Sequence, residues 1–160
     1  MITLVRKSEL TQAEWRESDS DKAVWTISVH RMKASREHNI YLSRQAMDIM
    51  IGLQVCVGGS DYILPGRYDI RKHISNSSLN RVISETVNFI QQRGEEFEHF
   101  TVHDLRRTAS TLLHEAGFNS DWIEKQLAHE QRGVRAVYNK EERAAQRRDM
   151  LQQWANMVDK

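Results

Sequence analysis

The chain has 160 residues, of which 39% are apolar, 28% are charged, seven are glycine and one is proline. This composition excludes collagen-like, proline-rich and strongly disordered classes, and the length suits one domain that buries roughly 70% of its unfolded surface. Its one cysteine, Cys56, excludes an internal disulfide framework and a cysteine-only metal cluster. No apolar run approaches the ~18 residues of a membrane span, so a soluble intracellular protein is expected. The 23 basic and 22 acidic residues nearly cancel, so a nucleic-acid partner must be argued from individual residues.

The first 43 residues predict a short helix followed by a small sheet. Residues 1–12 indicate the helix, and residues 23–29 alternate as a strand does. The strand's expected inward face is formed by Trp25, Ile27 and Val29. Residues 38–42 give a second, weaker strand signal. The two segments together predict an antiparallel hairpin with a polar link.

The middle of the chain predicts two helices separated by a long loop. Ser43 is placed to cap a helix over about 44–55, and residues 57–77 contain three glycines and the one proline, as loops do. A second helix is expected over 79–90. The apolar positions on which these two helices depend are Ala46, Ile49, Met50 and Leu53, then Leu79, Val82, Ile83, Val87 and Ile90.

The last third predicts three helices. Thr101 and Asp104 form a possible capping box, Gly117 suits the end of that helix, and Asn119 or Ser120 suits the start of the next. A final helix is expected from about 141 to 158. The apolar positions are Leu105, Ala109, Leu112, Leu113 and Ala116, then Ile123 and Leu127, then Ala144, Leu151, Trp154 and Val158. The predicted fold is mainly α with a small antiparallel sheet near the N-terminus.

Six residues have the side chains that attack on a phosphodiester requires: Arg6, Lys33, His103, Arg106, His129 and Tyr138. His103 and Arg106 share one helix face because they are three residues apart. A tyrosine has a pKa near 10, so it becomes a nucleophile at neutral pH only beside cations and a base. Arginines bind the non-bridging oxygens and a lysine protonates the leaving oxygen, with no metal required. Taken singly, each residue also fits an ordinary packing or surface role.

Residues 100–140 hold the last four of these residues in a fixed order. His103, Leu105 and Arg106 give the pattern H-x-L-R, an L-x-H pattern ends at His129, and Tyr138 follows nine residues later. This segment closely resembles the second conserved region of the tyrosine recombinases, in particular those of the bacteriophage integrase type.

The resemblance extends upstream and covers nearly the whole chain. Residues 4–15 resemble the first arginine box of the family, with Arg6 and Glu9 in register and Ser8 where glycine is common. Residues 24–43 resemble the family's β-hairpin that carries the catalytic lysine, which matches Lys33. The resemblance implies an α+β tyrosine recombinase catalytic domain over residues 1–160, a single and partial one, with the upstream DNA-binding segments absent.

The family chemistry assigns a role to each matching residue. Tyr138 would cleave DNA to give a 3′-phosphotyrosyl link and a free 5′-hydroxyl, and religation would complete recombination with no metal or other cofactor. Arg6 and Arg106 would clamp the scissile phosphate. Lys33 would protonate the 5′-oxygen, and His103 would accept the tyrosine proton.

The resemblance also implies supporting residues and partners. His129 would hydrogen-bond the phosphate, and Glu9 would help to hold the first arginine box. The partners would be double-stranded DNA at attachment sites and other recombinase subunits, which would form a tetramer on the DNA. The protein would act in the cytoplasm of a bacterial or phage-infected cell, and no membrane partner is expected. Because the net charge is small, we expect weak, salt-sensitive DNA affinity. Trp154 and Met157 would either dock on a neighbouring subunit or fold back on their own core.

Three other interpretations are open to the sequence. Segments 102–116 and 120–128 resemble a helix-turn-helix superficially, but Asp121 and Glu124 would then face DNA. A type IB topoisomerase shares the chemistry and differs in not requiring two DNA sites. An inactive remnant that serves only as a DNA-binding or protein-interaction module is the remaining alternative.

Overall fold

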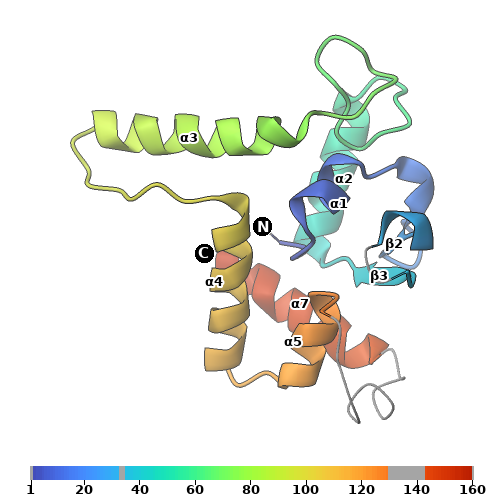
Figure 1. The fold of residues 1–160 in the computed structure, drawn as a ribbon. Coiled ribbons are helices and arrows are strands. Elements are labelled where there is room, and N and C mark those ends of the chain that lie inside the picture. The colour runs from blue at the N-terminus through green and yellow to red at the C-terminus, as the bar shows by residue number, and fades with distance from the viewer. Residues whose placement is uncertain (1, 33–34, 130–142, 160) are drawn as a thin grey trace.

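A computed structural model describes residues 2–32, 35–129 and 143–159 of the chain (Figure 1). Helices α1 to α5 are Lys7–Thr11, Arg44–Cys56, Asn76–Gln92, Val102–Glu115 and Ser120–Gln126, and α7 is Ala144–Val158. Strands β1 to β3 are Ser18–Asp19, Val24–Ile27 and His38–Tyr41, and the 3₁₀ turns η1 and η2 are Trp15–Glu17 and Val29–Arg31. The expected fold, mainly helical with a small sheet near the N-terminus, is confirmed.

The sheet has three antiparallel strands in the order β1-β2-β3. The predicted hairpin is β2 and β3, with Trp25 opposite Ile40, and β1 is an additional edge strand of two residues. The first predicted strand was too long, since the chain turns into η2 at Val29. That side chain is 43% exposed, so the expectation that it joins Trp25 on the inward face was wrong.

The N-terminal segment is mostly extended, which corrects the prediction of a helix over residues 1–12. The helix α1 occupies only Lys7–Thr11. Leu4 has a left-handed backbone with φ of 60°, and Arg6 is the extended N-cap. Leu4 and Val5 are buried in two separate core clusters. The apolar run at the start of the chain therefore reflects burial of an extended segment between these clusters.

The predicted N-capping residues are confirmed, whereas the helix predicted over 79–90 is longer and spans Asn76–Gln92. The Ser43 hydroxyl accepts from the Ala46 amide at 3.2 Å, and Thr101 forms the capping box with Asp104. Asn119, the first of the two residues considered, caps α5. The predicted loop over 57–77 contains no helix or strand until α3 begins at Asn76.

Two large apolar clusters form the core. One joins α4, α5 and α7 and includes Leu113 and Trp154, and the other joins β2, β3 and α2. Trp154 is 4% exposed, so it packs in its own core, whereas Met157 is 37% exposed. Six positions expected on inward faces are instead exposed: Ile49, Val82, Leu105, Leu112, Ala116 and Val158. Helical periodicity places them near the edges of those faces, where solvent still reaches them.

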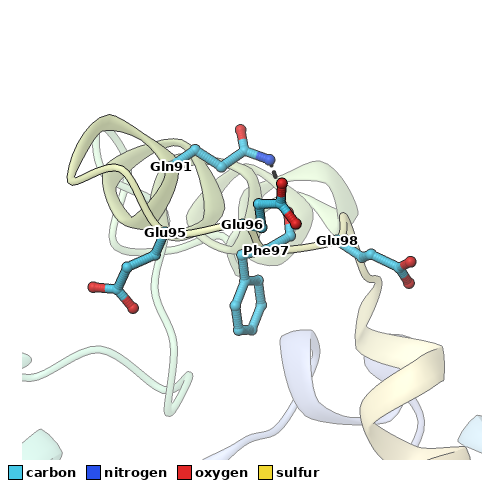
Figure 2. A pocket seen from close by; sticks show the side chains of 5 residues that line it. All are labelled: Gln91, Glu95, Glu96, Phe97 and Glu98. Atoms are coloured by element: carbon cyan, nitrogen blue, oxygen red, sulfur yellow. Dashed lines mark hydrogen bonds between the residues drawn. The ribbon is translucent and has the colours of Figure 1, made fainter.

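Helix α3 extends away from the other helices, and an irregular segment returns the chain to α4 (Figure 1). Figure 2 shows Glu95, Glu96, Phe97 and Glu98 on this segment, with Gln91 of α3 beside them. These five residues line an open hollow of about 480 Å³. Three carboxylates disfavour a phosphate ligand here by like-charge repulsion. No helix in the described residues is long and apolar enough to cross a membrane.

Candidate active site

The candidate site is built around the C-terminal end of α5. The amide of Ala128 donates to the Lys125 carbonyl and the amide of His129 donates to the Glu124 carbonyl, both at 3.1 Å, which is the Schellman pattern of helix ends. Ala128 takes the left-handed position with φ of 48°, where glycine is usual. This turn ends the helix and leaves its last carbonyl groups, at the negative end of the helix dipole, to bind donors from elsewhere.

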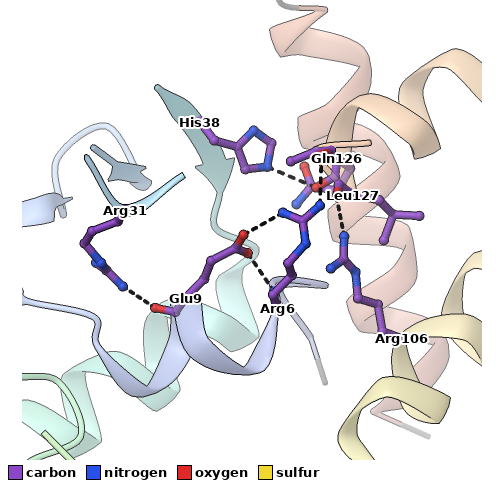
Figure 3. A network of polar contacts seen from close by, with 8 residues as sticks. Arg6, Glu9, Arg31, His38, Arg106, Gln126 and Leu127 are labelled. Carbon is purple, nitrogen blue, oxygen red and sulfur yellow. Dashed lines mark hydrogen bonds and ion pairs between the residues drawn. The ribbon is translucent and has the colours of Figure 1, made fainter. Parts of the chain in front are cut away.

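Three consecutive carbonyls at this helix end contact side chains from three different elements (Figure 3). Arg106 of α4 donates to the Leu127 carbonyl, and Arg6, the N-cap of α1, donates to the Ala128 carbonyl at 3.0 Å. His38 of β3 lies 3.0 Å from the carbonyl of residue 126 through its Nε2. The fold thereby brings together two arginines that are 100 positions apart in the sequence.

Glu9 holds Arg6 from the side away from α5. Its carboxylate accepts hydrogen bonds from the Arg6 main-chain amide and from Nη1, each at 2.7 Å, and its side chain is 5% exposed. Arg31 donates to the Glu9 carbonyl and is paired with Glu17 (Figure 3 shows the first contact). Arg6 itself remains 33% exposed, so it reaches solvent between these two anchors.

Arg106 is buried and incompletely satisfied. Burial, and then the charge of nearby Arg6, lower the pKa of Arg106 to about 10, against the opposing effects of Glu9 and Glu124. The guanidinium therefore stays charged at neutral pH. Its Nε–H has no hydrogen-bond partner among the described residues. An unsatisfied buried donor costs about 1–3 kcal/mol, so two adjacent cations with a spare donor favour an anion as the missing partner.

The two histidines occupy different positions. His129 directly follows Ala128, and its Nδ1 lies 2.7 Å from the Glu124 carboxylate. Since an ionised carboxylate only accepts, Nδ1 carries the proton and the opposite ring edge, with Nε2, is directed elsewhere. His103 is exposed on α4, one helical turn before Arg106. Lys33 and Tyr138 lie outside the described residues. Of the other four expected residues, the structure brings Arg6, Arg106 and His129 together at this helix end with Glu9, while His103 lies one turn away on α4.

Sequence reasoning missed three buried polar residues beneath this site: His38, Gln126 and Arg147. A signal was present for Arg147, because it falls at helical spacing on the apolar stripe that contains Ala144 and Leu151. His38 likewise alternates with buried Ile40 along β3. A polar residue at an inward position indicates a buried network, because such a group must find partners.

Among the described residues, no group of three or more His, Cys, Asp or Glu side chains is placed to hold a metal ion. The cation pair at the helix end favours an anionic ligand.

The chain matches one family model and several known integrases. The model of the Phage integrase family matches residues 1–144. The chain is 36% identical over 159 residues to prophage integrase IntA of Escherichia coli (strain K12), and 34% identical over 177 residues to the integrase of Enterobacteria phage P4. These alignments include 99% of this chain but 37% and 38% of the relatives, so the chain spans less than two-fifths of their length.

A solved structure shares the fold. The XerA recombinase superposes with a TM-score of 0.67 at 17% sequence identity, over 94% of this chain and 53% of that chain. The likeness at this identity concerns the fold. With a family model that matches 144 of 160 residues and with relatives above 30% identity, the chain belongs to the phage integrase family.

Proposed function

We propose that residues 1–160 are a single catalytic domain of a tyrosine-type site-specific recombinase, which cuts and rejoins double-stranded DNA at attachment sites. In the first step the Tyr138 hydroxyl oxygen bonds to the scissile phosphorus and the bond to the 5′-oxygen breaks. The products are a 3′-phosphotyrosyl link and a free 5′-hydroxyl. Attack by a 5′-hydroxyl of another strand reverses the step, so no high-energy cofactor is consumed.

The observation that carries this proposal is the convergence of Arg6 and Arg106 on consecutive carbonyls at the end of α5. Main-chain carbonyls and Glu9 hold the two guanidinium groups in fixed positions before any ligand arrives. Such preorganised cations stabilise the charge that grows on the non-bridging oxygens, at no reorganisation cost during the reaction. The unpartnered Nε–H of Arg106 is a donor that a phosphate oxygen would satisfy.

The other roles follow from chemistry and chain position. Lys33 donates a proton to the leaving 5′-oxygen, and His103 accepts the proton of Tyr138. His129 donates to a phosphate oxygen through Nε2 while Glu124 holds Nδ1. Both ring nitrogens donate only in the protonated ring, so the Glu124 carboxylate compensates a positive charge on His129.

Recombination joins two DNA sites, so the proposed assembly contains several subunits, a tetramer on DNA. The proposed setting is the cytoplasm of a bacterial or phage-infected cell, where the DNA substrate is found. With 23 basic and 22 acidic residues, DNA affinity rests on local cations and is expected to fall steeply with salt.

Covalent capture tests this proposal. The chain is mixed with labelled DNA from the element's own junctions, nicked so that cleavage is trapped, and denatured protein–DNA adducts are resolved on a gel. Tyr138→Phe is compared with Tyr68→Phe, which removes the same hydroxyl from a side chain that is 94% exposed.

We expect an adduct with the wild type and with Tyr68→Phe, and none with Tyr138→Phe. An adduct that survives Tyr138→Phe contradicts the assignment of the nucleophile. DNA binding without any adduct favours the non-catalytic DNA-binding module instead.

A further inference from the structure

Helix α7 contributes a fully buried arginine to the region beneath the candidate site. Arg147 is 0% exposed, and its Nε and Nη2 donate to Gln126 Oε1 at 3.2 and 2.9 Å. It also donates to the Asn39 carbonyl and lies over the Tyr41 ring at 5.0 Å. A buried charge is costly unless its donors are satisfied, and here the donors are directed at main-chain and amide oxygens.

Gln126 is the residue that this arginine holds. It is 1% exposed, and its polar groups contact three other segments of the chain. Oε1 accepts from Arg147, Nε2 donates to the Thr3 carbonyl at 3.0 Å, and the main-chain oxygen contacts His38. Since a carbonyl only accepts, His38 is the donor through a protonated Nε2. Gln126 therefore joins α7, β3 and the N-terminal segment at one point.

The position of Gln126 affects both arginines of the site. The two carbonyls that follow it, at Leu127 and Ala128, are those that bind Arg106 and Arg6. Its side chain also holds the carbonyl of Thr3, three residues before Arg6. A shift of Gln126 would move the acceptors of both arginines and the backbone that leads to one of them. Misplacement by about 1 Å is enough to cost on the order of 100-fold in rate.

We infer that Gln126 is a positioning residue for the two-arginine phosphate site, and that Arg147 acts through it. Helix α7 begins six residues after Tyr138 in the sequence, so this contact links the segment behind the proposed nucleophile to the groups that bind the phosphate. The role as a positioning residue for catalysis rests on the proposed function. The positioning of the anion site does not, because phosphate binding is measured separately.

The test compares Gln126→Met on α5 and Arg147→Met on α7 with a control variant on α7. Gln152→Met also removes hydrogen bonds of a glutamine, to Gln45 at 2.9 Å and to the Arg44 amide at 3.0 Å, but these join α7 to α2. Urea unfolding first establishes that each variant is folded. Where Gln126→Met does not fold, Gln126→Glu replaces it, since a carboxylate still accepts from Arg147 but no longer donates to Thr3.

The first measurement is a titration with inorganic phosphate, followed by NMR of the arginine Nε–Hε signals. We expect the signal of Arg106 to respond in the wild type and in Gln152→Met with dissociation constants within twofold. We expect phosphate binding to be at least tenfold weaker in Arg147→Met and in the Gln126 variant, whether that variant carries Met or Glu. Equal binding by the folded Gln126 variant and the control overturns the inference, whether or not the protein cleaves DNA.

The second measurement is the single-turnover rate of adduct formation on nicked DNA. We expect the variants at 126 and 147 to react about 100-fold more slowly, with DNA affinity within threefold of the wild type. Because Arg147 acts through Gln126, adding Arg147→Met to the Gln126 variant should slow the reaction less than twofold further. If the rate losses of the two substitutions multiply in the double variant, the inference is contradicted. If the wild type forms no adduct, the proposed function is refuted. The phosphate titration then still tests whether Gln126 positions the anion site.

Discussion

The buried histidine of β3 makes the stability of the fold depend on pH in a predictable direction. Burial, and then the charge of Arg147, lower the pKa of His38 to about 4 from an ordinary value of 6.5. The hydrogen bond to the Gln126 carbonyl and the charge of Glu9 oppose this shift. The unfolded chain therefore binds a proton at a higher pH than the folded chain does. The stabilising contribution is complete above pH 6.5 and is lost as the pH falls toward 4.

The magnitude follows from proton linkage. Lowering the pKa of His38 from 6.5 to about 4 contributes about 3 kcal/mol to the free energy of unfolding, at 1.36 kcal/mol for each pKa unit. Between pH 7 and pH 5, where the folded state stays neutral and the unfolded state becomes protonated, the wild type should lose about 2 kcal/mol of unfolding free energy through this residue.

Urea unfolding at pH 7, 6 and 5 measures this effect, with His38→Gln as the comparison. A glutamine Nε2 can still donate to the carbonyl but does not titrate, so the variant should lack this part of the pH dependence. Other ionisable groups are common to both proteins and cancel in the difference. His30→Gln, at an exposed position, is the control and should follow the wild type. Parallel pH profiles of wild type and His38→Gln would refute the reasoning.

Three further predictions concern the helix ends, the core and the site. Ala128→Gly should raise, and Gly117→Ala lower, the unfolding free energy by about 1 kcal/mol in urea titrations, because both positions are left-handed helix ends with φ of 48° and 82°; equal signs would contradict this. Leu113→Ala removes a fully buried side chain from the α4–α5–α7 cluster and should cost about 2–5 kcal/mol in the same assay, and a loss under about 1 kcal/mol would contradict the assigned packing. Arg106→Lys keeps the charge but loses the guanidinium geometry, so adduct formation should slow by about 10²–10³-fold, and a rate near that of the wild type would count against the proposed phosphate clamp.

Features fixed by local hydrogen bonding were predictable from the sequence. The N-caps Ser43 and Thr101 and the glycine helix end at Gly117 lie where the pattern placed them. The N-terminal helix was predicted too long, because the apolar character of Leu4 and Val5 comes from burial of an extended segment in two clusters. A periodic pattern shows which residues of a helix are apolar. Whether each of them is buried depends on which element packs against it.

The site was predictable as a set of residues but not as an arrangement. The resemblance to the family selected Arg6, Arg106 and His129, yet nothing in the sequence shows that the carbonyls of Leu127 and Ala128 anchor the two arginines. Main-chain acceptors carry no sequence signature, since every residue has one. The positioning groups were missed for a related reason: a buried polar side chain such as Arg147 resembles a surface residue until its partners are known.

Identification of the residue bonded to DNA tests the central claim most directly. The adduct trapped on nicked DNA is digested with nuclease and trypsin, and the modified peptide is sequenced by mass spectrometry. The account predicts a nucleotide on Tyr138, within the tryptic peptide of residues 136–140. A nucleotide bonded to any other residue, or an intact unmodified peptide in protein that has cleaved DNA, would contradict it.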